Sequence, residues 1–130
     1  MYDRSDPRAA LAAKATVAPV MPGFFASPEY GRFYEQPPAE TGAAGKSWYI
    51  RGQNFVLGYS EATPGGTFSR ANQADEYVLI FPDRETRATV SAGGETREVE
   101  GFSVVMVPPG QSSVTLTNGG RFIRLVTTRA

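Results

Sequence analysis

The chain has 130 residues, of which 41% are hydrophobic and 20% are charged, and this balance is typical of one folded domain with a single core. Thirteen basic residues offset thirteen acidic ones, so the formal net charge is zero and the chain offers no basic field for nucleic acid. Cysteine and histidine are both absent from the sequence, which excludes disulfides, thiolate nucleophiles, the usual general base and the commonest transition-metal ligand.

The N-terminal sequence does not resemble a secretory signal peptide. Asp3 and Asp6 lie where positive charge is expected, and Pro19 and Pro22 interrupt the only apolar run. No other stretch is long and apolar enough to predict a membrane span. We therefore expect a cytoplasmic protein with neither a membrane nor a nucleic-acid partner.

Residues 1–46 are predicted to form an irregular N-terminal arm. Ser5, Asp6 and Pro7 are typical of a helix start, and the alanine-rich residues that follow predict a short helix near residues 7–14. Beyond it prolines and glycines recur, and aromatic residues lie between them at Phe24, Phe25, Tyr30, Phe33 and Tyr34. A disordered linker seldom carries so many aromatic rings. We expect the arm to pack on a surface, either of its own domain or of a second subunit.

Residues 47–130 follow a two-residue alternation of apolar and polar side chains, which predicts an all-β domain. Glycine and proline separate the strands, and the step from Ala92 to Glu95 through Gly93 and Gly94 predicts a tight hairpin. The spacing favours a sandwich or a barrel. The predicted strands cover residues 47–51, 54–62, 67–70, 75–81, 86–92, 95–100, 102–107, 113–117 and 121–128.

Three stretches, Pro64–Phe68, Ala74–Leu79 and Gly101–Gly110, together resemble the two motifs of the cupin superfamily. The first cupin motif has a glycine, a His-x-His pair and a glutamate, and the second has a glycine, an apolar strand, Pro-x-Gly and a histidine. The second is the more specific half here, because GFSVVMVPPG reproduces both strand and corner. The resemblance covers roughly residues 47–130 and implies an RmlC-like jelly-roll barrel, also called a double-stranded β-helix.

The residues that bind metal in cupins are mostly missing from this sequence. Ala71–Ala74 stands where the resemblance would place His-x-His, and Ser113 stands where it would place the second-motif histidine. Glu76 falls at the glutamate position, so one of four implied ligands remains. Imidazole supplies most of the affinity of such sites for transition metals. We expect a degenerate member without a metal or other cofactor.

The candidate pocket predicted from these positions consists of Glu76, Ser69, Asn72, Ser113, Thr115 and Tyr59. The resemblance implies that Glu76 points into the barrel mouth on the face shared by Val78 and Ile80. There it would act as an acid of raised pKa, or Arg70 or Arg124 would neutralise it in an ion pair.

The same positions imply that Ser113 and Thr115 face the lumen and form a hydroxyl-lined wall for a small polar ligand. The alternative is a solvated strand face, where serine and threonine are also common. Nucleophilic catalysis has no support, because the serines have no histidine to activate them.

Three functions remain open at this point. The leading hypothesis is a metal-free cupin-like module that binds a small molecule or mediates assembly as a homodimer. The second is a metal-independent enzyme of the isomerase, epimerase or lyase type, with Glu76 or a tyrosine as acid or base. The third is one degenerate barrel of a two-barrel cupin.

Overall fold

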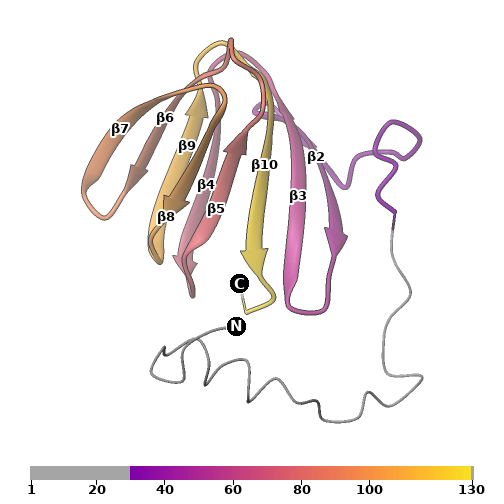
Figure 1. The fold of residues 1–130 in the computed structure, drawn as a ribbon. Helices are drawn as coiled ribbons and strands as arrows, with labels where there is room; N and C mark the ends of the chain where they lie inside the picture. The colour runs from indigo at the N-terminus through magenta and orange to yellow at the C-terminus, as the bar shows by residue number, and fades with distance from the viewer. Residues whose placement is uncertain (1–29, 130) are drawn as a thin grey trace, which may run out of the picture.

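The computed structural model describes residues 30–129, and these form two antiparallel sheets that face each other (Figure 1). The predicted helix near residues 7–14, together with Phe24 and Phe25, lies outside the described residues. The strands are β1 (Glu40–Gly42), β2 (Gly45–Arg51), β3 (Phe55–Ala62), β4 (Gly66–Gln73), β5 (Tyr77–Phe81), β6 (Arg87–Ala92), β7 (Glu95–Glu100), β8 (Ser103–Val107), β9 (Gly110–Leu116) and β10 (Gly120–Thr127).

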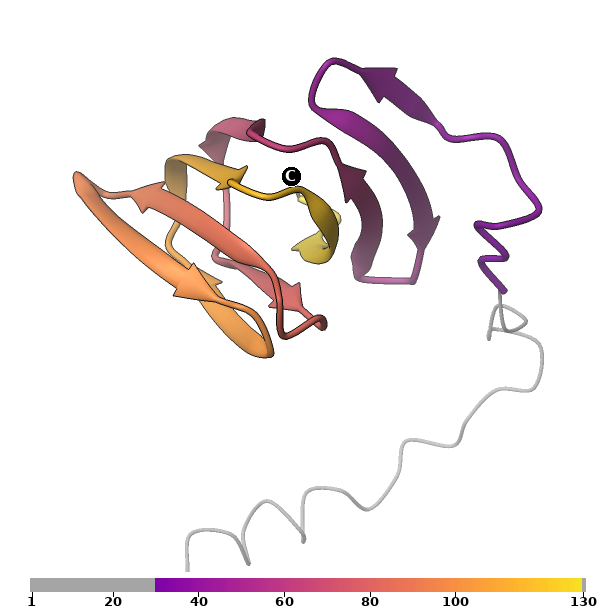
Figure 2. The ribbon, with the colours of Figure 1, turned by 90° about the horizontal axis from the view of Figure 1, so that it is seen from above.

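One sheet has six strands in the order β1-β2-β3-β10-β5-β8, and the other has four in the order β4-β9-β6-β7. Seen from above, β1 and β2 lie at one side of the molecule and the β6–β7 hairpin lies at the opposite side (Figure 2). No strand pair among the described residues joins the two sheets. The prediction of an all-β jelly roll is confirmed. The two sheets face each other but do not close into the barrel that the resemblance implied.

Each of the nine predicted strands is present, and β1 is an additional strand that the alternation did not reveal. β1 pairs with β2, whose first residue is Gly45, so strand structure begins within the range assigned to the arm. The predicted hairpin is confirmed. Gly93 and Gly94 take φ values of 57° and 79°, which are those of a type I′ turn and are open to glycine without strain.

The core lies between the sheets and is built from alternate residues of each strand. Directly opposed residues of an antiparallel pair share a face, so the register fixes which side chains point inward. In β5 these are Tyr77, Leu79 and Phe81, each at most 2% exposed. Val78 and Ile80 therefore face outward. The rest of the buried cluster consists of Ala88, Val90, Val107, Val114, Leu116 and Phe122.

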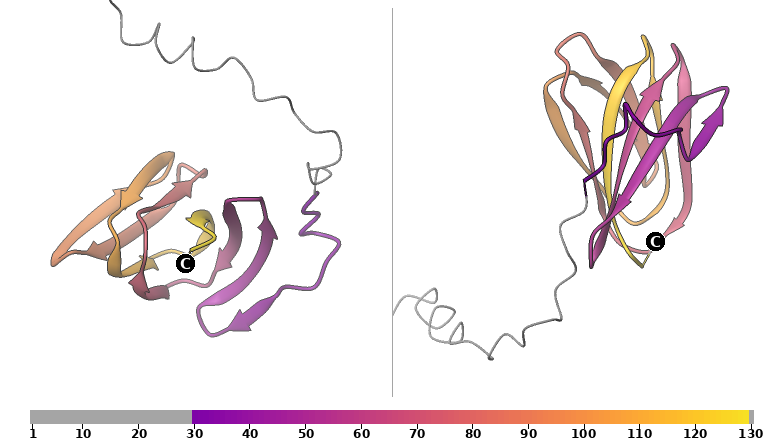
Figure 3. Two further views of the ribbon diagram at one scale, coloured as in Figure 1. Left: turned by 90° about the horizontal axis from the view of Figure 1, so that it is seen from below. Right: turned by 90° about the vertical axis from the view of Figure 1, so that its right-hand side faces the viewer.

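The segment before β1 packs on the outer face of the six-stranded sheet. The Phe33 ring stacks on Tyr59 with 5.2 Å between centroids, and the Trp48 ring lies 6.3 Å from Phe33. Trp48 Nε1 donates to the carbonyl of Gln36 at 2.9 Å. The side view shows this segment crossing β2 and β3 (Figure 3). Of the two packing surfaces that the sequence left open for the arm, Phe33 therefore uses the one on its own domain.

Two other aromatic residues of this segment do not pack in the same way. Tyr30 and Tyr34 are 81% and 85% exposed. The expectation that the arm buries its rings therefore holds for Phe33 and is wrong for these two tyrosines. Within residues 30–129 there is no helix with the length and apolarity needed to cross a membrane.

Candidate functional site

The six predicted site residues do not converge on one pocket. Ser69, Ser113 and Thr115 lie on the outer face of the four-stranded sheet, whereas Tyr59 lies on the outer face of the six-stranded sheet. Glu76 and Asn72 lie at strand ends, on two further parts of the surface. None of the six lines the interior of the jelly roll.

Ser113 was expected to face the lumen, and the structure shows that Ser112 does so instead. Ser112 is 4% exposed and shares its face with Val114 and Leu116, which are 1% and 0% exposed. Burying two aliphatic side chains stabilises the fold far more than burying two hydroxyls, so the apolar set decides the register. Because the period is two, Ser113 and Thr115 must then face outward.

Glu76 was expected to point into the mouth of the barrel, and this prediction is wrong. It immediately precedes the inward-facing Tyr77, is exposed, and borders a shallow depression that is otherwise largely apolar, with Phe55, Val78 and Met106 among its lining residues. No hydrogen bond or ion pair within residues 30–129 engages its carboxylate. Neither expected partner approaches it, because Arg70 Nε donates to Gln73 Oε1 and Arg124 bonds hydroxyl groups.

Asn72 and Tyr59 have local structural roles. Asn72 has φ of 56° at an irregularity in β4, where the pairing with β9 shifts between Arg70 and Gln73. Asparagine tolerates this left-handed conformation better than most residues. Tyr59 is held beneath Phe33, and its hydroxyl donates to Glu61 at 3.3 Å. Burial, followed by the nearby Glu61 carboxylate, raises the pKa of Tyr59 above its usual value.

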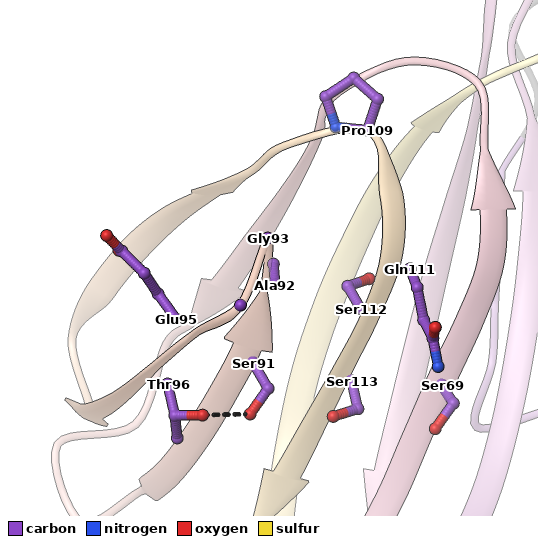
Figure 4. Close-up of a pocket in the computed structure, with 11 residues that line it drawn as sticks. Ser69, Ser91, Ala92, Gly93, Glu95, Thr96, Pro109, Gln111, Ser112 and Ser113 are labelled. Carbon is purple, nitrogen blue, oxygen red and sulfur yellow. Dashed lines mark hydrogen bonds between the residues drawn. The ribbon is translucent and has the colours of Figure 1, made fainter.

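The outer face of the four-stranded sheet carries a hydroxyl row, one side chain from each strand. The register places Ser69 of β4 beside Ser113 of β9, Ser113 beside Ser91 of β6, and Ser91 beside Thr96 of β7. Figure 4 shows the four side chains side by side, with the 2.9 Å hydrogen bond between Ser91 and Thr96 drawn. Of the two orientations that the sequence left open for Ser113 and Thr115, the solvated strand face is the one observed, and the row across four strands was not predicted.

A depression of about 550 Å³ lies over this hydroxyl row. One end is formed by the glycine turn between β6 and β7, and Pro109, Gln111 and Glu95 complete its rim (Figure 4). A second row adjoins it, in which Thr67 and Thr115 are hydrogen-bonded at 2.8 Å. Every hydroxyl can both donate and accept, so the surface offers several hydrogen bonds of either sense at the strand spacing.

The interior holds a second polar cluster, centred on Arg124 of β10, that the sequence analysis did not identify as a site. Arg124 is 8% exposed, and its Nη2 lies 3.0 Å from Ser60 Oγ, 3.2 Å from Tyr49 Oη and 3.3 Å from Ser47 Oγ. Ser47 and Ser60 are themselves 2.8 Å apart. Arg124 shares its strand face with Phe122 and Val126, and a charge within that apolar series is the signal that could have identified it.

Aromatic rings surround the Arg124 guanidinium. Its central carbon lies 5.2 Å from the Phe68 ring, 5.5 Å from Phe122 and 5.8 Å from Tyr49, within the range of cation–π attraction. The Tyr49 hydroxyl also donates to Glu40 at 2.7 Å. The pKa of Tyr49 is raised above its usual value, mainly by burial and further by the hydrogen bond to Glu40.

The inner faces of β4 and β9, which would correspond to the cupin motifs, do not suit a metal ion. Their inward side chains at this level are Phe68, Arg70, Gln73 and Ser112. A phenyl ring cannot coordinate, a guanidinium repels a cation, and the oxygens of the other two are engaged by Arg70 and Tyr77. Within residues 30–129 no three Asp or Glu side chains are grouped closely enough to hold a metal.

Comparisons with known proteins support the fold. An RmlC-like cupin from Shewanella frigidimarina superposes with a TM-score of 0.65 at 14% identity, over 78% of this chain and 91% of that one. KdgF from a Halomonas species superposes with a TM-score of 0.64 at 9% identity, over 80% of this chain and 96% of that one. The cupin domain of Schizosaccharomyces pombe Cnp3 superposes with a TM-score of 0.57 at 13% identity, over 75% of this chain and 72% of that one.

No family model and no curated protein sequence matches the chain. The three solved structures named above are only 9% to 14% identical to this chain, so they show the fold and not the function. This chain therefore has the cupin fold, as the motifs indicated, and its chemistry has to be argued from its own side chains.

Proposed function

We propose that this protein is a cupin-fold module that binds a small polar molecule over the hydroxyl row, without a metal centre. The observation that carries the proposal is the depression of about 550 Å³ lined by hydroxyl groups from four neighbouring strands. Pockets for small molecules have this size and use a few placed polar groups to orient the ligand.

The chemistry of the lining indicates the class of ligand. Ser69 and Ser113 make no side-chain hydrogen bond with another residue among residues 30–129, so their hydroxyls are available to a ligand. Gln111 on the rim adds both a donor and an acceptor. A molecule with several hydroxyl or amide groups, such as a polyol or a sugar, matches this set. Its carbons would rest on Pro109.

A thermal-shift screen of polyols, sugars and small amides tests the proposal. We expect at least one member to raise the melting temperature of the wild type and not that of Ser113→Val, which removes the central hydroxyl. Thr89→Val is the matched control, since Thr89 is on the same sheet face but outside the lining. Equal shifts in all three proteins would contradict the proposed site.

Assembly is a second candidate function, favoured by the outer face of the six-stranded sheet. Val104 and Met106 of β8 are 64% and 58% exposed, and their strand neighbours Ile80 and Val78 share this face. β8 is also an edge strand, with one side unpaired among the described residues. A continuous apolar face of this kind marks an interaction surface, and a second copy supplies a matching one by two-fold symmetry.

Analytical ultracentrifugation tests this second candidate. We expect wild-type protein to sediment as a dimer and Val104→Glu to sediment as a monomer with unchanged circular dichroism. Thr117→Glu places the same charge at an exposed position next to the four-stranded sheet and should leave the dimer intact. A monomeric wild type would remove the assembly proposal and would not affect the hydroxyl row.

A further inference from the structure

Arg124 has one fully buried nitrogen that finds no hydrogen-bond acceptor among residues 30–129. Its Nε is fully buried and has no partner. Its Nη2 has three hydroxyl oxygens in range but only two N–H bonds, so these hydroxyls already exceed what Nη2 can use. Buried polar groups are nearly always paired, and a specific exception calls for an explanation.

The positive charge of Arg124 also lacks a direct counter-charge. None of the ion pairs within residues 30–129 includes it. The Glu40 carboxylate reaches it only through the Tyr49 hydroxyl, which accepts from Arg124 and donates to Glu40. Buried arginines are normally paired with an acid, because an uncompensated charge in the interior is costly. The guanidinium of Arg124 therefore has no anionic group in direct contact with it among residues 30–129.

The surrounding inward positions add cations. Arg51 follows Tyr49 on the inward face of β2, and Arg70 follows Phe68 on the inward face of β4. Arg51 is exposed and Arg70 is half-buried, so charge increases from the interior toward this end of the jelly roll. A series of like charges at the end of a low-dielectric interior attracts anions.

We propose that this interior binds a small organic carboxylate, with Arg124 as its anchor. A carboxylate oxygen accepts from Nε, and its single negative charge neutralises the single buried cation. The planar carboxylate matches the guanidinium edge and lies between the rings of Phe68 and Tyr49. Phosphate is less suited, because its second negative charge would lie beside aromatic rings without a second buried cation to neutralise it.

Tyr49 lies where a ligand would enter. It is 38% exposed, although its hydroxyl contacts the buried cluster, and it belongs to a strand next to the edge strand β1. An ideal Cβ on Gly58 would come within 2.9 Å of the Tyr49 ring and 3.7 Å of Arg124 Nε, so the ring covers the guanidinium edge because position 58 has no side chain. Displacing this ring exposes Nε to solvent.

The test is an NMR titration that observes the Nε–H signal of Arg124, assigned by its loss in Arg124→Lys. Sodium acetate, which carries one negative charge, is the carboxylate probe, acetamide is its neutral analogue, and sodium chloride and inorganic phosphate control for ionic strength and for anions in general. We expect a saturable shift of this signal with acetate alone. An absent shift, or equal shifts with phosphate or chloride, would overturn the carboxylate assignment.

Thermal denaturation provides a second readout. Acetate should raise the melting temperature of the wild type and of Arg97→Met, which removes an exposed arginine. It should have no effect on Arg124→Met, in which an apolar side chain of similar length replaces the cation. If Arg124→Met does not fold, the wild-type titration alone decides. An increase of the melting temperature with acetate that persists in folded Arg124→Met would contradict the proposal.

Discussion

The hydroxyls of Tyr77 and Ser112 lie 2.7 Å apart in the interior and join the two sheets, because Tyr77 is in β5 and Ser112 is in β9. Tyr77 is 2% exposed and Ser112 is 4% exposed, so neither hydroxyl has water as an alternative partner. This contact shows that Ser112, and not its neighbour Ser113, points into the domain. The same bond occupies the hydroxyl of Ser112, which is the residue next to Ser113, where the second cupin motif has its histidine.

Removing either partner should destabilise the domain. Tyr77→Phe leaves the Ser112 hydroxyl buried without a partner, at a cost of about 1–3 kcal/mol of unfolding free energy, and Ser112→Ala has the reciprocal effect. The double variant should lose less than the sum of the two, because the orphaned group is also gone. Urea denaturation measures all three. Ser113→Ala is the control, expected within about 0.5 kcal/mol of the wild type. Strict additivity would show that the two hydroxyls are not coupled.

Phe33→Ala should uncover Trp48. The Phe33 ring covers Trp48 and Tyr59 on the outer sheet face, and Trp48 is only 8% exposed. Since Trp48 is the single tryptophan, its emission should shift to longer wavelength, and stability should fall by about 3 kcal/mol or less, as for a partly buried aromatic. Tyr34→Ala, at an exposed aromatic in the same segment, should change neither quantity. An unchanged emission maximum in Phe33→Ala would mean that another group covers Trp48.

The Asp83–Arg121 pair should contribute to stability near neutral pH and lose that contribution in acid. Arg121 Nε and Nη2 both donate to Asp83, at 2.9 and 3.0 Å, and this bond lowers the pKa of Asp83. A carboxyl whose folded pKa is depressed stabilises the fold above its unfolded pKa of about 3.9 and loses this effect as the pH falls through the folded pKa.

Asp83→Asn should therefore flatten the dependence of the urea midpoint on pH below about pH 4, with a small effect because the pair is exposed. Glu85→Gln is the control, because no ion pair among residues 30–129 includes its side chain. If the urea midpoint fell as steeply with decreasing pH in Asp83→Asn as in the wild type, the proposed contribution of the Asp83–Arg121 pair would be contradicted.

Gly101 should not tolerate a side chain. A Cβ there would lie 1.8 Å from the Asp83 carbonyl oxygen and 2.8 Å from backbone atoms of Arg84, so the turn between β7 and β8 would have to move. Gly101→Ala should cost at least about 1–3 kcal/mol, as overpacking does. Gly42→Ala is the matched control, because a Cβ at Gly42 meets nothing within 4 Å. Similar urea midpoints for both variants would contradict this close approach.

The sequence predicted the strands well because alternation and glycine turns are local signals. It missed β1, which has three residues, all exposed, and therefore shows no alternation. The cupin motifs indicated the fold even where their ligands were missing, since the Pro-Pro-Gly corner between β8 and β9 depends on backbone geometry and not on metal chemistry.

The candidate site was harder to predict, because a register shift of one residue reverses every side chain. Aligning Ser113 with the motif histidine placed the hydroxyls inside, whereas the burial of Val114 and Leu116 places them outside. The irregularity around Asn72 shifts the partner strand in the same region. The Arg124 cluster unites β2, β3 and β10, and such long-range proximity has no local signature in the sequence.

The central claim is that this cupin fold works without a metal centre, because Phe68, Arg70, Gln73 and Ser112 line the positions where one would be held. Elemental analysis by plasma mass spectrometry, on tag-free protein purified without chelators, tests it most directly. We predict far less than one equivalent of manganese, iron, nickel, copper or zinc per chain. One equivalent of any of these metals, retained through gel filtration, would contradict the account.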